Sequence, residues 1–240
     1  DEPVAGRREL QLFRRRDLPT LSCAVVWAGL GGVQMIDQRG DVVWTNRRLA
    51  PNLSIAGVVG PVELDRGGGV DGATDRLWVC GEQGALMSLR GAGRSGIPRE
   101  LAGWRVQQLA AATVGKGPAA SGLATNDSMM AALSYNRRGE VALVAFDQDV
   151  REQWSYPLPS GTLPSRNRRL VSGSFFAEGA GDWAVAAADG TIHLVSADGA
   201  TSDFVATGER LTGVAIGRIE DQAWLVYSSP TSINAYRWDG

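Results

Sequence analysis

The segment GDWAVAAADGTIHLV, residues 181–195, decides the fold of this 240-residue chain. Two short runs of alternating character, Trp183 to Ala187 and Gly190 to Val195, flank an Asp-Gly-Thr turn. Alternation with a period of two is typical of β-strands, and glycine tolerates the positive φ that tight hairpin turns require. The segment therefore predicts a β-hairpin with its turn at or just before Gly190.

The same hairpin pattern recurs along the chain. A glycine and an alternating apolar stretch begin at Gly31, Gly84, Gly139 and Gly190, and a fifth copy without the glycine begins at Thr231. The spacings between these starts are 53, 55, 51 and 41 residues. A second strand-like run precedes each copy: Leu21 to Ala28, Leu77 to Cys80, Met129 to Tyr135, Trp183 to Ala187 and Ala223 to Tyr227. Self-similarity at such a period indicates a repeat architecture.

Two further strand-like runs accompany most of the hairpins. Aromatic runs follow the hairpin at Val42 to Trp44, Leu101 to Trp104, Gln153 to Tyr156 and Asp203 to Val205. Runs of small apolar residues come next, at Ile55 to Val59, Leu109 to Val114, Leu170 to Phe176 and Leu211 to Ile216. Four short strands per unit are typical of a β-propeller blade, with small residues in the crowded innermost strand and aromatic residues in the outermost.

The chain length predicts the number of blades. Five units in 240 residues give 240/5 = 48 residues each. We therefore expect an all-β fold, a β-propeller of about five four-stranded blades, in a single domain over residues 1–240 that could be a fragment of a longer protein. The alternating run Glu9 to Phe13 fits either the outer strand of the last blade or the innermost strand of the first. We favour the first placement, because pairing of the N- and C-terminal strands closes the ring and removes an exposed edge.

Residues 181–195, and the Gly139 copy that continues to Gln153 and Trp154, resemble the repeats of quinoprotein-like (PQQ-type) and WD-repeat-like β-propellers. The resemblance implies the fold far more than an activity. Quinoprotein dehydrogenases are larger and bind their cofactor beside a pair of adjacent cysteines. Cys23 and Cys80 are far apart in the sequence, so no cofactor is expected here.

Charge and composition limit the classes of partner and the kind of environment expected for this protein. The formal net charge of −2 predicts no nucleic-acid partner, and no apolar run approaches the roughly 18 residues that membrane insertion requires. Only Lys116 among the 24 basic residues is lysine, which favours a GC-rich, bacterial genome over selection for arginine. Cys23 and Cys80 could form one disulfide, but strand-like surroundings favour buried free thiols. The compartment stays open, cytoplasmic or periplasmic and secreted.

Catalytic and metal sites find little support in the sequence. The chain has one histidine, His193, and its position inside a strand favours a packed, hydrogen-bonded side chain over a ligand or a base. No Gly-x-Ser-x-Gly motif is present. The carboxylate pairs Asp147 with Asp149 and Glu220 with Asp221 could perform acid–base chemistry or bind Ca²⁺, but their places at strand ends favour turn acids. We therefore predict no catalytic residue and no metal site.

Charge placement gives the sharper inference. In a propeller, the turns between second and third strands share one face with the connections between blades. The expected binding residues on this face are Arg47, Arg48, Arg105, Arg137, Arg138, Arg166, Arg168 and Arg169. The opposite loops carry most of the acids, among them Asp37, Asp41, Asp147, Asp149 and Asp198. The alternative is that loops simply collect charges of both signs.

These patterns favour a non-catalytic interaction or scaffold module whose Arg-rich face docks an acidic protein surface or peptide. The alternative is a propeller with a site at the mouth of the central channel that binds a small ligand or a sugar or hydrolyses its substrate. The sequence does not decide whether the protein is an enzyme, but it favours a protein without catalytic activity. Nucleic-acid binding ranks third, because no dense aromatic platform can be placed beside the arginines.

Overall fold

A computed structural model describes residues 7–14, 21–27, 32–47, 58–62, 76–80, 84–90, 94–113, 128–147, 149–161, 169–176, 181–220 and 222–238. Every regular element in these ranges is a β-strand, which confirms the all-β prediction. No helix among the described residues is long and apolar enough to cross a membrane.

The strands form five antiparallel sheets in chain order. Blade 1 contains β1 (Arg7–Arg14), β2 (Leu21–Trp27), β3 (Gly32–Ile36) and β4 (Val42–Asn46). Blade 2 contains β5 (Val58–Val62), β6 (Arg76–Cys80), β7 (Leu86–Arg90) and β8 (Arg94–Ser95). Blade 3 contains β9 (Trp104–Thr113), β10 (Ser128–Asn136), β11 (Val141–Phe146) and β12 (Glu152–Leu158). Blade 4 contains β13 (Leu170–Gly173), β14 (Asp182–Ala186), β15 (Thr191–Val195) and β16 (Ser202–Ala206). Blade 5 contains β17 (Gly213–Ile219), β18 (Gln222–Ser228) and β19 (Ile233–Trp238).

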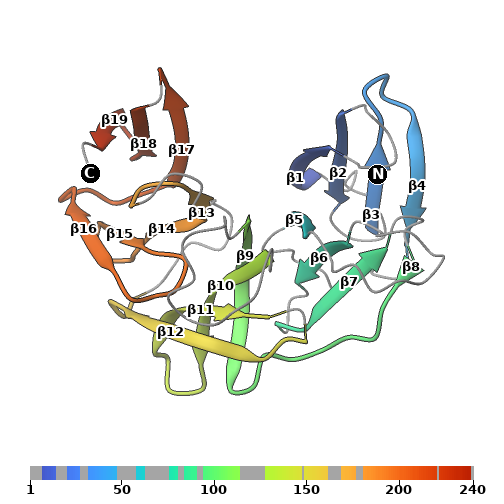
Figure 1. The fold of residues 1–240 in the computed structure, drawn as a ribbon, viewed down its shortest axis with the longest axis horizontal. Coiled ribbons are helices and arrows are strands. Elements are labelled where there is room, and N and C mark those ends of the chain that lie inside the picture. The colour runs from blue at the N-terminus through green and yellow to red at the C-terminus, as the bar shows by residue number, and fades with distance from the viewer. Residues whose placement is uncertain are drawn as a thin grey trace, which may run out of the picture.

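The five blades follow one another along an arc, with the first strand of each blade toward the middle (Figure 1). These innermost strands touch in sequence, β1 against β5, β5 against β9, β9 against β13 and β13 against β17. The arrangement is that of a β-propeller. All five predicted hairpins are present as the second and third strands of the blades.

The glycines at the hairpin turns have the positive φ that the sequence predicted at Gly84, Gly139 and Gly190; Gly31 lies outside the described residues, and Gly32 has this φ in blade 1. Gly84 shows why no other residue suits the turn. Its φ is +84°, and an added Cβ would lie 2.8 Å from the backbone nitrogen of Val106 in β9. The turn of blade 2 therefore packs directly on the first strand of blade 3.

Apolar side chains are buried mainly between adjacent blades. Each of three clusters joins neighbouring blades and contains large buried residues from both of them: Trp78 and Phe146 for blades 2 and 3, Leu143 and Trp183 for blades 3 and 4, Leu194 and Leu225 for blades 4 and 5. Cys80 belongs to the first cluster, and its side chain is buried, as predicted. Its thiol donates to the Val106 carbonyl oxygen at 3.1 Å. The side chain of Cys23 lies outside the described residues.

The N-terminal strand corrects the expected closure of the ring. β1 pairs antiparallel with β2, with Leu12 opposite Cys23, so it is the innermost strand of blade 1. The expectation that it completes the last blade is wrong, and β17 to β19 form a three-stranded sheet within the described ranges. The connection from residue 14 to residue 21 is short, and short connections favour pairing between strands that follow each other in sequence.

The outer strand of blade 2 also differs from the prediction. Leu101 to Trp104 does not form it; Leu101 to Gly103 make a turn and Trp104 begins the innermost strand of blade 3. The outer position is taken by β8 and by an isolated bridge between Leu86 and Arg99. The sequence Arg94-Ser95 has no apolar alternation, so it gives no strand signal. The other predicted outer strands are confirmed as β4, β12 and β16.

Candidate functional site

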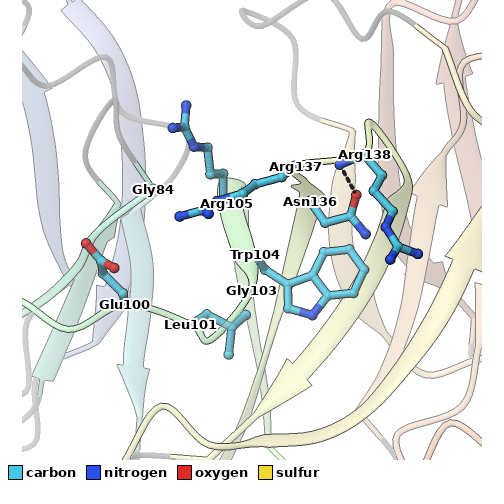
Figure 2. Close-up of a pocket in the computed structure, with 9 residues that line it drawn as sticks. All are labelled: Gly84, Glu100, Leu101, Gly103, Trp104, Arg105, Asn136, Arg137 and Arg138. Carbon is cyan, nitrogen blue, oxygen red and sulfur yellow. Dashed lines mark hydrogen bonds between the residues drawn. The ribbon is translucent and has the colours of Figure 1, made fainter.

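A pocket of about 510 Å³ lies at the junction of blades 2 and 3. It opens on the face that carries the turns between second and third strands, which we call the pocket face. Its walls come from the β6–β7 turn, the connection into β9 and the β10–β11 turn (Figure 2). The lining residues are Gly84, Glu100, Leu101, Gly103, Trp104, Arg105, Asn136, Arg137 and Arg138.

The connection between blades 2 and 3 positions Trp104 in this pocket. Leu101 is buried and its carbonyl oxygen accepts a hydrogen bond from the Trp104 backbone N–H at 3.0 Å. Gly103 turns the chain with φ of +80°. The indole Nε1–H of Trp104 donates to Glu152 Oε2 in β12 at 3.1 Å. Both ends of the tryptophan are therefore held, and its half-buried ring is a fixed wall of the pocket.

The β10–β11 turn presents two arginines at its tip. Asn136 Oδ1 accepts hydrogen bonds from the backbone N–H groups of Arg138 at 2.9 Å and Glu140 at 3.1 Å. The Gly139 N–H donates to the Asn136 carbonyl oxygen at 3.1 Å and closes the turn. An asparagine at the start of a turn stabilises it by such side-chain to backbone bonds. The turn thus fixes where the side chains of Arg137 and Arg138 begin.

Positive charge dominates the pocket. Arg105, Arg137 and Arg138 are exposed, and no described carboxylate forms an ion pair with any of them. Glu100 is the acid in the lining, and Figure 2 shows it on the opposite side of the pocket from Asn136 and Arg138. With respect to the described part of the chain, these arginines can bind an anion without first breaking a salt bridge.

The other arginines expected at this face have different environments. Arg47 is exposed just after β4 and does not line the pocket. Arg48, Arg166 and Arg168 lie outside the described residues. Arg169 is 2% exposed, so it is not available to a docking partner.

Arg169 instead connects three blades. Its Nη2 donates to the Leu211 carbonyl oxygen, at the entry to blade 5, at 2.9 Å. Its backbone N–H donates to Gln108 Oε1 in β9 at 2.7 Å. Burial, and then the nearby positive charge of Arg210, lower the pKa of Arg169 below its ordinary value. Its role in the described structure is to position blades.

Of the nine lining residues, sequence reasoning predicted the three arginines as site residues and missed the polar or aromatic side chains of Glu100, Trp104 and Asn136. Trp104 was not predicted as a site residue, because its segment was assigned to the outer strand of blade 2, away from the turns that form the pocket. Asn136 carried a usable signal, since Asn-Arg-Arg-Gly between two strand-like runs is typical of a tight turn. No local signal marks Glu100, because its position beside the pocket depends on how blade 2 packs against blade 3.

His193 is a packed, hydrogen-bonded histidine, as predicted. Its Nδ1 lies 3.2 Å from the Tyr156 hydroxyl and its Nε2 lies 2.8 Å from Thr191 Oγ1. Burial lowers the pKa of His193 below 6.5, and the charge of Asp189 opposes that shift only in part. The histidine therefore joins β15 to the outer strand β12 of blade 3.

The paired carboxylates are turn acids where the structure describes them. Asp147 Oδ1 accepts hydrogen bonds from the backbone N–H groups of Asp149 at 2.8 Å and Arg151 at 2.9 Å. Asp149 forms an exposed ion pair with Arg99 at 3.1 Å. Glu220 is exposed at a turn, and Asp221 lies outside the described residues. Within the described ranges, no group of three or more His, Cys, Asp or Glu side chains is placed to hold a metal ion.

Comparison with known proteins supports the fold. No protein-family model matches the chain, and no curated protein is similar to it in sequence. Among solved structures, BBS1N in complex with ARL6DN aligns with a TM-score of 0.64 and 13% identity over 95% of this chain and 64% of that chain. The chain therefore spans less than two thirds of BBS1N.

Two other solved structures are similar at comparable levels. The SapL1 lectin in complex with alpha methyl fucoside aligns with a TM-score of 0.55 and 12% identity over 99% of this chain and 79% of the lectin. The Dos1 propeller aligns with a TM-score of 0.52 and 10% identity over 92% of this chain and 52% of that chain. The fold is a β-propeller. Likeness at such low identity establishes this architecture and no activity.

Proposed function

We propose that the protein is a non-catalytic interaction module that docks an acidic segment of a partner protein in the arginine pocket between blades 2 and 3. The supporting observation is that Arg105 at the start of β9, and Arg137 and Arg138 in the β10–β11 turn, line one pocket together with Trp104. Arginine and tryptophan are the residues most enriched at binding hot spots. Arginine also binds carboxylates through its planar fork of N–H donors.

The charge distribution of the turns supports the same proposal. Arg47 lies on the pocket face, whereas the turns between third and fourth strands carry four acids, Asp37, Asp41, Asp147 and Asp149, against two bases, Arg39 and Arg151. A partner with an acidic segment is attracted to one side and repelled by those turns. Such steering raises association rates and weakens with salt, because the Debye length is about 8 Å at physiological ionic strength.

The test compares two double variants of equal net charge. Arg105→Glu/Arg137→Glu reverses two charges of the pocket, and Arg39→Glu/Arg151→Glu reverses two exposed charges in turns of the opposite face. Binding of a fluorescent glutamate-rich peptide is followed by anisotropy. We expect about tenfold or greater loss of affinity in the pocket variant only, since each lost charged contact amounts to about a factor of ten. Equal binding by both variants contradicts the proposal.

Arg169 is left unchanged in this experiment. Its guanidinium is buried and bonded to Leu211, so its replacement would disturb the blades and confuse the result. Arg138 is kept as well, because its backbone N–H donates to Asn136 Oδ1 and helps to form the turn. Circular dichroism of both variants checks that the all-β fold is retained.

A small-ligand site is the second candidate. A pocket of about 510 Å³ falls in the usual range for small-molecule sites, about 300–1,000 Å³. One similar structure is a lectin solved with alpha methyl fucoside. Calorimetric binding of methyl fucoside that survives Arg105→Glu/Arg137→Glu but disappears in Trp104→Ala would favour this candidate.

The finer relationship to quinoprotein-type repeats also stays a proposal, supported by the Asp189-Gly190-Thr191 turn of blade 4. The same holds for a single propeller domain over residues 1–240. BBS1N was solved with the protein ARL6DN, which agrees with a protein partner for a propeller of this kind without identifying one here.

A further inference from the structure

The pocket carries more positive charge than one carboxylate neutralises. Its lining contains three arginines and one glutamate, a sum of 3 − 1 = +2. Glu140 and Glu152 do not line the pocket, and their carboxylates accept hydrogen bonds from Asn136 Nδ2 and Trp104 Nε1 respectively. The lining itself is therefore matched by a ligand group with more than one negative charge.

The two charges must lie close together. The arginines come from the start of β9 and from the β10–β11 turn, whereas Glu100 lies on the blade 2 side, across the pocket from Asn136 and Arg138 (Figure 2). A run of acidic residues long enough to supply two carboxylates would bring negative charge toward Glu100. A single dianionic group avoids that repulsion, because it concentrates its charge at the arginine side.

The uncharged walls of the pocket can contact the part of the ligand that surrounds its anionic group. The Trp104 ring is held by its hydrogen bond to Glu152, so it offers a fixed apolar surface to a side chain or backbone. Gly84 contributes backbone alone to the lining, packed closely against the start of β9. The Asn136 turn is ordered by its own bonds, and a pre-ordered site loses less entropy on binding.

From these observations we infer that the pocket recognises a phosphorylated serine or threonine in the partner segment. The inference rests on the proposed function and names the ligand group at the same site. A phosphorylated side chain carries about −1.5 to −2 charge at neutral pH and three acceptor oxygens. The guanidinium groups of Arg105 in β9 and of the arginines in the β10–β11 turn can each donate two hydrogen bonds to these oxygens. An unphosphorylated acidic residue offers one charge and two oxygens.

The experiment uses three peptides of one scaffold with phosphothreonine, glutamate or threonine at the central position. Affinity is measured by calorimetry, and the contact site by chemical-shift changes at the Arg138 and Glu140 amides. We expect the phosphothreonine peptide to bind about tenfold more tightly than the glutamate peptide, as one added charge-assisted hydrogen bond allows. Arg105→Gln/Arg137→Gln should remove this preference, and the matched variant Arg39→Gln/Arg151→Gln should keep it.

The outcomes separate the two proposals. Equal affinity for the phosphothreonine and glutamate peptides at the pocket overturns the phosphate inference and leaves acidic docking in place. Affinity that is insensitive to Arg105→Gln/Arg137→Gln overturns both proposals. Inorganic phosphate that binds as tightly as the phosphothreonine peptide overturns peptide recognition, because the Trp104 wall would then contribute nothing.

Discussion

Thr191 determines which ring nitrogen of His193 carries the proton. The Thr191 hydroxyl donates to Asp189 Oδ1 at 2.6 Å, so its oxygen must accept from His193 Nε2, 2.8 Å away. Nδ1 is then the acceptor for the Tyr156 hydroxyl at 3.2 Å. The neutral ring satisfies every bond in this chain, which agrees with the lowered pKa of His193 that burial causes.

This histidine predicts a pH dependence of stability. Because the folded-state pKa lies below 6.5, the unfolded chain binds a proton more readily as pH falls below that value. The free energy of unfolding should therefore decrease from pH 6.5 downward until the folded-state pKa is passed, and stay constant below it. His193→Gln removes this contribution. Urea unfolding at several pH values should show a smaller acid-side decrease in the variant.

The difference in pH dependence between the wild type and His193→Gln can be assigned to this residue, because the chain has one histidine. A wild-type protein that keeps constant stability relative to His193→Gln between pH 8 and pH 5 would contradict the burial of a neutral ring. Carboxylate titration affects both proteins alike, so the difference between them isolates this residue.

Gly84 predicts a second effect at the scale of one residue. Gly84→Ala should lower the free energy of unfolding by about 2–4 kcal/mol, because left-handed strain adds to a Cβ forced against β9. Gly40 is the matched control, since its φ is +90° and a Cβ there would meet nothing within 4 Å. Gly40→Ala should therefore cost only about 1 kcal/mol. Equal losses in chemical denaturation would contradict the close packing of blade 2 on blade 3.

At the scale of elements, one turn chemistry appears on both faces. Asp37 Oδ1 accepts from the N–H groups of Arg39 and Asp41 in the β3–β4 turn, as Asn136 Oδ1 does from Arg138 and Glu140. Both turns orient their backbone by a short polar side chain. They differ in position, since only the Asn136 turn lines the pocket.

That difference makes a paired prediction. Asn136→Ala and Asp37→Ala should each lower the free energy of unfolding by about 1 kcal/mol, because each leaves two backbone donors without their acceptor. Only Asn136→Ala should weaken binding of the acidic peptide. Thermal unfolding and anisotropy of the two variants check this, and a similar loss of binding in Asp37→Ala would argue against the pocket as the docking site.

At the scale of the whole molecule, the blades differ in how far they are enclosed. Every residue of β11 and β14 is buried, because blades 3 and 4 have neighbours on both sides. In blade 5, β19 is mostly exposed, with Ile233 80% exposed. Packing on two sides raises the free energy needed for local opening.

Hydrogen exchange should reproduce this gradient. We expect the slowest amide exchange in β10, β11, β14 and β15, and faster exchange in β17 to β19. Mass spectrometry of peptides from each blade measures it. Uniform protection across the described blades would show that the molecule opens only as a whole, against the expected order.

Sequence patterns alone were sufficient for the hairpins, the turn glycines and the all-β architecture. These features depend on local rules: a period of two in each strand, and turn residues such as Gly84 and Asn136 that suit few other conformations. The same rules placed Arg137 and Arg138 at one turn on the face expected to bind. They also predicted that His193 and Cys80 are buried, because both lie in strand-like segments.

Only the tertiary structure decided which blade takes β1, that Trp104 begins an innermost strand, that Arg105 shares a pocket with Arg137 and Arg138, and that Arg169 is buried. Each of these depends on a contact between segments that are distant in sequence or between successive blades. An alternating strand forms equally good hydrogen bonds at several sheet edges. The sequence around a charged residue does not show which side chains pack beside it in the folded protein. The physical reason is that pairing and burial are decided by the neighbouring blade.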